Sequence, residues 1–156
     1  MERYNVMFVA SAGGHLTELL KLSSLFINYN YVLVTERNKI SLDLRKKFKV
    51  EFLLYGSRHY PVRYFIVSCF NFFKNIYLFF KYKPDLIYTT GAHTGVMLCY
   101  LAKLFRKKVV FVEVYDRVLT PTLSGRLVYP IADCFIVQHP ELLIEFPKAK
   151  YIGGIY

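Results

Sequence analysis

The chain has 156 residues, a net charge of +10 and an apolar fraction of 54%, with 18% aromatic residues. This length suits one domain with a hydrophobic core, and the apolar fraction excludes a disordered chain. Three widely spaced cysteines, Cys69, Cys99 and Cys134, exclude a disulfide framework and suggest no metal site, so we expect reduced core cysteines in a cytosolic setting.

Strand-like and helix-like segments alternate along the chain. Apolar runs that predict strands cover residues 5–10, 31–35, 50–55, 85–89, 109–112, 134–137 and 151–152. Patterns that predict helices cover residues 16–26, 41–48, 62–82, 94–105 and 122–131. The runs are continuously apolar, as in strands that are covered on both faces. We therefore predict an α/β fold, a Rossmann-like, doubly wound and mostly parallel sheet, formed by residues 1–156 as a single domain. We expect no signal peptide at the N-terminus.

Nearly all of the excess positive charge lies in residues 37–83, which contain eleven basic and two acidic residues. Such an asymmetry indicates a polyanionic partner on one side of the molecule, either a membrane surface or a nucleic acid.

Residues 62–82 form the most unusual of the predicted helices. Ser68, Asn71 and Asn75 fall on one stripe, and most of the remaining circumference is aromatic or aliphatic. Its length is at the lower edge for a membrane span, and polar residues at its centre argue against one. The aromatic side chains and the flanking basic residues favour a helix that lies at a membrane interface, and their wide helical face fits lipid better than nucleic-acid bases. The alternatives are a core helix, a protein interface and a true span. The residues expected at the membrane are Arg63, Phe65, Phe70, Phe72, Phe73, Lys74, Phe79, Phe80 and Lys81, with Arg58 and Lys83 flanking them.

A glycine pair, Gly13 and Gly14, follows the first predicted strand and precedes a helix. Such a turn brings backbone N–H groups and a helix N-terminus towards an anion. The pattern is neither Gly-x-Gly-x-x-Gly nor a Walker A loop. The pair therefore predicts either phosphate binding or a structural turn. His15 comes next, and it is expected to contact the ligand, to act as an acid or base, or to cap or pack the helix.

Two further strand ends carry similar residues. Gly91 and Gly95 flank His93 and Thr94 after the strand at residues 85–89. Two such glycine turns suggest either a diphosphate ligand or two separate ligand groups. Glu113 follows the strand at residues 109–112 as a candidate base or hydroxyl-binding group; alternatively it caps a helix or pairs with a nearby arginine. In a doubly wound sheet, ligands bind beyond these carboxyl ends.

Four segments carry a resemblance to a known family: SAGGHLTELLKL, PDLIYTTGAHTG, VFVEVYDRVLTPTLSGRLVYPIADCFIVQHPEL and the final YIGG. The chain resembles the bacterial PssD-type exopolysaccharide and capsule glycosyltransferase subunits. It also resembles the membrane-recruiting subunit of the eukaryotic two-subunit N-acetylglucosaminyltransferase that makes chitobiosyl-diphosphodolichol. A more distant likeness is to the N-terminal half of the transferase that adds N-acetylglucosamine in lipid II synthesis.

The resemblance implies the acceptor-binding half of a GT-B glycosyltransferase, with the donor domain on a separate partner subunit. It implies transfer from a UDP-sugar, with inversion, to a polyprenyl-diphosphate-linked acceptor at the cytoplasmic face of the membrane, with residues 62–82 as the membrane contact and no cofactor. Glu113 and His15 are then the catalytic candidates, although Val112 replaces the histidine that precedes the glutamate in the lipid II enzyme. The expected acceptor-binding residues are Ser11, Gly13, Gly14, His15, Thr90, Gly91, His93, Thr94, Gly95 and Arg117.

Three other classes of function remain open from the sequence. A non-catalytic activator of a partner transferase would carry the same residues. A Rossmann-type oxidoreductase would be expected to show a third glycine in the first turn, and a carboxylate after the second strand, where Glu36 is the one candidate. A nucleic-acid binder would use the basic segment, and we do not expect this partner.

Overall fold

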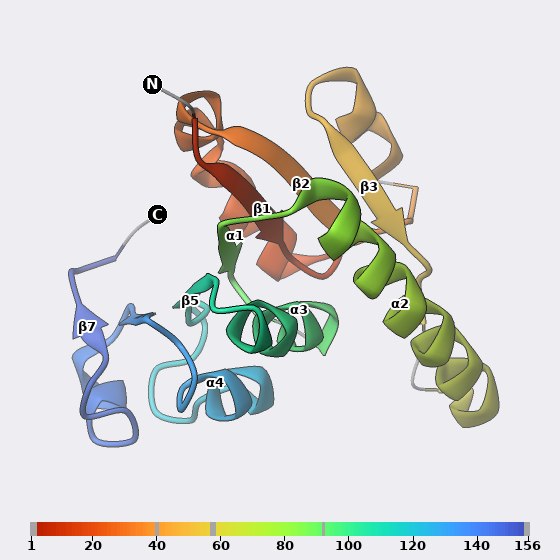
Figure 1. Cartoon of the computed structure of the whole chain (residues 1–156). Coiled ribbons are helices and arrows are strands. Elements are labelled where there is room, and N and C mark those ends of the chain that lie inside the picture. Colours follow the sequence, from red (N-terminus) through yellow and green to blue (C-terminus); the bar gives the residue numbers. More distant parts are fainter. Residues whose placement is uncertain (1–2, 40, 57–58, 92, 155–156) are drawn as a thin grey trace.

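The computed structural model describes residues 3–39, 41–56, 59–91 and 93–154. Seven strands form one sheet in the order β3-β2-β1-β4-β5-β6-β7, and every neighbouring pair is parallel (Figure 1). The strands are β1 Asn5–Val9, β2 Asn30–Glu36, β3 Val50–Leu53, β4 Leu86–Thr89, β5 Lys108–Val112, β6 Cys134–Val137 and β7 Lys150–Tyr151. The predicted class, a doubly wound parallel sheet, is confirmed.

The helices agree with most of the predicted segments. They are α1 Gly14–Lys21, α2 Pro61–Tyr82, α3 His93–Leu104 and α4 Leu123–Val128, with 3₁₀ turns η1 Ser23–Asn28, η2 Ser41–Lys46 and η3 Pro140–Leu143. The helix expected over residues 16–26 is divided into α1 and η1, and the segment at residues 41–48 is a 3₁₀ turn. The η3 turn was not predicted, because a single turn is too short to show a periodic pattern.

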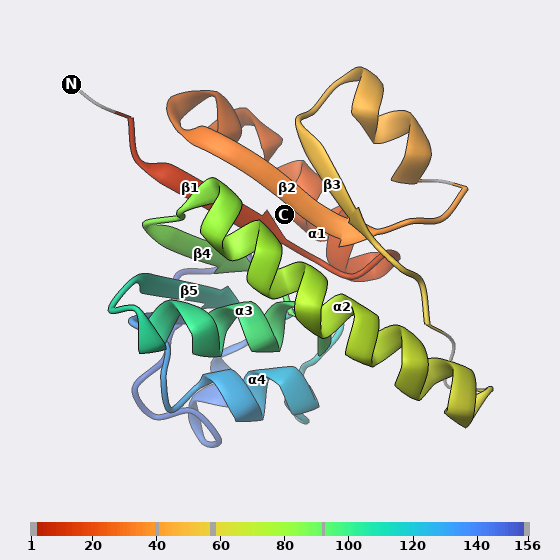
Figure 2. The ribbon, with the colours of Figure 1, turned by 45° about the vertical axis from the view of Figure 1, so that its right-hand side comes forward.

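The sheet is covered on both faces, as its apolar strands predicted. Met7 and Val9 of β1 face the core beneath α2, α3 and α4, whereas Val6 and Phe8 face the core beneath α1 and η1. Figure 2 shows α2, α3 and α4 together on the near face of the sheet. Successive strand residues point to opposite faces, so each strand supplies both cores.

The buried face of the long helix α2 is partly polar. Asn71 and Asn75 are buried against the rest of the protein, while most of its aromatic side chains are exposed. Asn71 accepts a hydrogen bond from the backbone N–H of Leu54 at 2.9 Å and donates one to the Leu54 carbonyl at 2.8 Å. The asparagine stripe therefore attaches α2 to the end of β3 and leaves an apolar outer face.

The expectation of three core cysteines is wrong for one of them. Cys99 is buried and Cys134 is partly buried, but Cys69 is exposed on α2. The sequence pattern did not distinguish the two faces of this helix because both contain apolar residues.

Candidate functional site

The site lies where the strand order reverses, between β1 and β4. The chain leaves β1 towards β2 on one side and leaves β4 towards β5 on the other, so a crevice opens beyond their carboxyl ends. The two glycine turns occupy this position. Gly13 has φ +116° and Gly91 has φ +105°, and both conformations strongly favour glycine because it lacks a Cβ atom.

The two turns are joined by hydrogen bonds. His15 Nδ1 lies 2.8 Å from the carbonyl oxygen of Thr90, and Thr90 Oγ1 donates to the carbonyl oxygen of His15 at 2.8 Å. The hydroxyls of Ser11 and Thr94 are 2.9 Å apart. Because a carbonyl can only accept, Nδ1 of His15 carries a proton and the neutral ring keeps its lone pair on Nε2. The structure therefore holds His15 in the tautomer that a general base facing a ligand requires.

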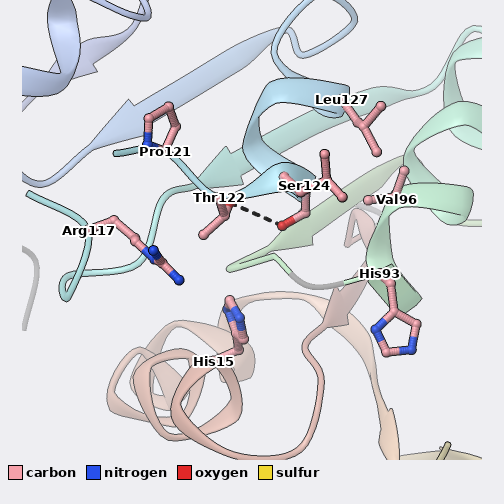
Figure 3. A pocket seen from close by; sticks show the side chains of 9 residues that line it. His15, His93, Val96, Arg117, Pro121, Thr122, Ser124 and Leu127 are labelled. Atoms are coloured by element: carbon pink, nitrogen blue, oxygen red, sulfur yellow. Dashed lines mark hydrogen bonds between the residues drawn. The ribbon is translucent and has the colours of Figure 1, made fainter. Parts of the chain in front are cut away.

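A cavity of about 560 Å³ opens beside these turns. Figure 3 shows His15 rising into it from α1, with Arg117 on one side and Thr122 and Ser124 opposite. Its lining combines imidazole, guanidinium and hydroxyl groups, which can bind and donate hydrogen bonds to an anion. The lining residues are His15, His93, Val96, Arg117, Pro121, Thr122, Leu123, Ser124 and Leu127.

The glycines of the two turns differ in what surrounds them. A Cβ atom at Gly13 or Gly14 would meet no atom within 4 Å, so the first turn is open to a ligand. A Cβ at Gly91 would lie 3.2 Å from Phe111, and one at Gly95 would lie 2.7 Å from Thr89 Oγ1. Close packing against Phe111 of β5 and Thr89 of β4 thus favours glycine in the second turn, whereas the first presents open backbone at the start of α1.

Glu113 is fully buried and is not among the cavity-lining side chains. Its carboxylate accepts hydrogen bonds from Thr122 Oγ1 at 2.9 and 3.0 Å, from the Thr122 N–H at 3.2 Å and from the Val114 N–H at 3.1 Å. Burial raises the pKa of Glu113, while the bonds from Thr122 and Val114 and the charge of His15 act in the opposite direction. These contacts match the structural alternative, in which Glu113 supports the start of a helix. Thr122 is the N-cap of α4 and accepts from the Gly125 N–H at 2.9 Å.

The structure brings part of the predicted acceptor-binding set together. Hydrogen bonds join Ser11 to Thr94 and His15 to Thr90. Of the predicted residues, His15, His93 and Arg117 line the central cavity, whereas Gly13 lines a separate one. Sequence reasoning missed three residues near the site. Thr122 and Ser124 lie in an unremarkable stretch, Thr-Leu-Ser-Gly, whose cap pattern was the available signal. Glu36 was considered only against an oxidoreductase, and it lies beside His93.

The outer face of α2 carries the predicted membrane residues, with one correction. Phe65 and Phe73 are 68% and 69% exposed. Phe70, Phe72, Phe80 and Arg63 are also exposed, and Lys74 is partly buried. Phe79 is only 4% exposed and packs 5.4 Å from Phe105 between ring centroids, so it belongs to the core and not to a membrane face.

The charges near this face are partly used within the protein. Lys81 forms an ion pair with Glu51 at 2.8 Å. Arg58 lies outside the described residues. Within the described ranges, no helix combines the length and the apolarity needed to cross a bilayer.

The sequence matches known proteins over almost its whole length. The profile of the family described as "Oligosaccharide biosynthesis protein Alg14 like" matches residues 6–155. The human "UDP-N-acetylglucosamine transferase subunit ALG14" is 29% identical over 182 aligned positions, covering 99% of this chain and 84% of the human protein. The mouse protein of the same name is 31% identical, with the same coverage.

Solved structures share the fold at low sequence identity. MurG from Acinetobacter baumannii superposes with a TM-score of 0.73 at 14% identity, covering 97% of this chain and 45% of that one. A UDP-N-acetylglucosamine 2-epimerase from Rickettsia bellii gives a TM-score of 0.69 at 16% identity, covering 98% of this chain and 45% of that one. The chain thus spans a little under half the length of these GT-B-like proteins. By its sequence it belongs to the Alg14-like family of oligosaccharide biosynthesis proteins.

Proposed function

We propose that this chain is the acceptor-binding, membrane-associating subunit of a two-component glycosyltransferase. It presents a polyprenyl-diphosphate-linked sugar to a partner subunit that binds the UDP-sugar donor. The observation that carries the proposal is the cavity at the β1–β4 switch point, where His15, His93 and Arg117 meet beside the open start of α1. Basic side chains and the unpaired amides of a first helical turn are the groups that bind a diphosphate.

The reaction that this geometry supports is direct displacement at the sugar. A hydroxyl of the lipid-linked acceptor attacks the anomeric carbon of the UDP-sugar, the carbon–oxygen bond to UDP breaks, and UDP leaves. The hydroxyl proton passes to Nε2 of His15, because the bond to Thr90 holds the other ring nitrogen in its protonated form. Arg117 and the first turn of α1 hold the acceptor diphosphate.

Glu113 has a supporting role in this proposal. Its carboxylate is buried beneath Thr122 and holds the loop that forms one wall of the cavity. A buried carboxylate does not reach an acceptor hydroxyl, so His15 is the stronger of the two catalytic candidates.

A second candidate function is activation without chemistry: the chain holds the membrane and the partner, and the partner supplies the base. The burial of Glu113 favours this possibility, because it removes one of the two candidate catalytic bases from the cavity and leaves His15. The two candidates differ in what they predict for His15.

The first test measures sugar transfer from labelled UDP-N-acetylglucosamine and other UDP-sugars to lipid-linked acceptors in membranes. The chain alone, the donor-domain partner alone and the two together are compared. We expect activity only from the pair. Activity of the partner alone, merely increased by this chain, would favour the activator, and activity of this chain alone would contradict the proposed division of the reaction between two subunits.

The second test replaces His15 by Asn in the active pair. The Asn side-chain amide takes the place of Nδ1–H, so it retains a donor to Thr90 while the basic Nε2 is lost. Loss of general base catalysis is expected to lower kcat by roughly 10² to 10⁴-fold. An unchanged kcat, with intact partner binding, would identify the chain as an activator.

Membrane contact through α2 is tested with vesicles that contain anionic lipid, in a sedimentation assay on the full chain. Phe65→Ser and Phe73→Ser remove exposed rings from the outer face of α2. Each change is expected to weaken vesicle binding roughly three- to tenfold, because buried apolar area drives interfacial binding. Ile144→Ser is the matched control, since Ile144 is 85% exposed and lies outside α2. Equal losses in all three variants would exclude α2 as the contact.

The biological setting proposed here is bacterial exopolysaccharide or capsule synthesis at the cytoplasmic face of the membrane. It is supported by the PssD-like motifs around Gly13, Gly91 and Glu113. Comparing polyprenyl-linked with dolichyl-linked acceptors in the same assay tests it. A strict requirement for the dolichyl acceptor would contradict this setting while leaving the two-component reaction intact.

A further inference from the structure

Glu36, at the end of β2, is a buried carboxylate that the proposed reaction does not use. It is 3% exposed, and its Oε1 atom has no hydrogen-bond partner. The backbone N–H of Ala12, in the first glycine turn, donates to the carboxylate. A buried charge is costly unless a charge of opposite sign lies close to it, so the groups around Glu36 decide whether its carboxylate is ionised.

His93, the first residue of α3, lies next to Glu36. Its Nε2 atom lies 3.4 Å from Glu36 Oε1, close enough for an ion pair with a protonated ring, although the contact does not have hydrogen-bond geometry. His93 lines the central cavity and also a smaller cavity of about 170 Å³ between α2 and α3. Figure 3 shows its ring leaving the start of α3 at the edge of the central cavity.

The position of His93 at the start of α3 disfavours a charged ring, and a nearby carboxylate opposes this effect. The amino end of a helix carries a partial positive charge, which disfavours an imidazolium at the first residue. Arg117 and His15, which line the same cavity, act in the same direction when they are charged. Tyr64 of α2, which is also titratable, has its ring centroid 5.7 Å from that of His93. Glu36 provides the opposing negative charge.

We propose that Glu36 is a positioning residue, which orients the His93 imidazole at the cavity edge and favours its protonated, anion-binding form. The proposal rests on the proposed function in that the anion is the diphosphate of the lipid-linked acceptor. Burial raises the pKa of Glu36 to about 7, opposed by the Ala12 N–H. At 3.4 Å, the two groups are close enough for the protonation of one to affect the protonation of the other.

The direct test follows the imidazole signals of the full chain by NMR as a function of pH, with His93→Gln used to assign those of His93. Glu36→Gln keeps the shape of the side chain and removes its charge. We expect the His93 signals of this variant to titrate about one pH unit lower than in the unmodified chain, since an opposite charge at this distance favours the protonated form.

The matched control is Thr35→Val. Thr35 is the preceding residue of β2, it is fully buried, and its Oγ1 atom also has no hydrogen-bond partner. It points to the opposite face of the sheet. Its substitution is expected to leave the His93 titration unchanged. Equal shifts in both variants, or no shift in Glu36→Gln, would overturn the proposal.

A binding measurement connects this pair to the acceptor. Inorganic diphosphate is titrated into the full chain at pH 7, and Glu36→Gln is expected to bind it about tenfold more weakly than Thr35→Val does. In the active pair, the alkaline limb of kcat/KM for the acceptor should move to lower pH, with a larger change in KM than in kcat. A shifted titration with unchanged diphosphate binding and pH profile would overturn the anion-binding role of His93.

The NMR and binding measurements distinguish failure of the Glu36–His93 proposal from failure of the proposed transferase function. The NMR titration does not depend on sugar transfer, so it tests the Glu36–His93 pair even if the two-component reaction is not observed. If Glu36→Gln does not fold, the pH titration of the unmodified chain still tests the proposal. His93 signals that titrate in two coupled steps support the pair, and a single step overturns it.

Discussion

Thr122 connects the cavity wall to the buried carboxylate of Glu113, and its replacement by Val tests this connection. The Thr122 hydroxyl donates to the Glu113 carboxylate at 2.9 and 3.0 Å and accepts from the Gly125 N–H at 2.9 Å as the N-cap of α4. Val retains the shape and loses both interactions. The backbone N–H of Thr122, which also bonds Glu113 at 3.2 Å, is unaffected.

The expected change in the free energy of unfolding follows from the loss of these two interactions. A hydrogen bond to a charged group contributes about 1.5–3 kcal/mol, and an N-cap contributes about 1 kcal/mol. We therefore expect Thr122→Val to lower the free energy of unfolding by roughly 2–4 kcal/mol. Thr122→Ser, which keeps the hydroxyl, should cost less than about 1 kcal/mol.

The assay is urea unfolding of the full chain, followed by circular dichroism, with both variants measured at several pH values. The hydroxyl lowers the pKa of Glu113 in the folded protein, so Thr122→Val raises this pKa further above its unfolded value of 4.5. A group with a raised pKa loses its stabilising contribution as pH rises, so the deficit of Thr122→Val should grow with pH and shrink towards pH 4.5. A Val variant within about 0.5 kcal/mol of the Ser variant at pH 7 would refute this account of the network.

Three further changes test other parts of the structure by the same unfolding measurement. Gly125→Ala would place a methyl group on Glu113 Oε2, so a loss of about 1–3 kcal/mol is expected, and a neutral result would show that the carboxylate can move away. Asn71→Ala removes both hydrogen bonds to the Leu54 backbone and should cost about 2–3 kcal/mol; an unchanged midpoint would mean that water replaces the amide. The pKa of Glu36 is raised from 4.5 to about 7, so its contribution is fully present below pH 4.5 and is lost as pH rises through 7, by about 3 kcal/mol. Glu36→Gln should remove this pH dependence, and an identical slope in the variant would contradict the raised pKa.

The sequence by itself determined the order and type of most elements. Continuous apolar runs such as the one that forms β1 predicted strands covered on both faces, and the structure places Met7 and Phe8 in two different cores. The glycine pair after that run predicted a turn before a helix, and Gly13, with φ +116°, lies directly before α1. These features are local, because periodicity and turn chemistry depend on neighbouring residues.

Only the tertiary structure decided which side chains meet at the site. The contact of Glu36 with His93 joins residues 57 positions apart, and the bonds between His15 and Thr90 span 75 positions. Such contacts depend on where each strand ends relative to its neighbours, and no local pattern contains this register. The same reason explains why the orientation of Glu113 was not predicted. A carboxylate after a strand has the same sequence pattern whether it faces the cavity or, as here, the loop at Thr122.

The orientation of α2 was also decided by the fold. Its sequence has two candidate buried faces, an asparagine stripe and a broad aromatic surface. Burial of an apolar face is the usual outcome, but Asn71 can satisfy both backbone groups of Leu54 only when the asparagine stripe faces inwards. The aromatic face is consequently exposed, while Phe79 lies on the inner edge of the helix and is buried in the core.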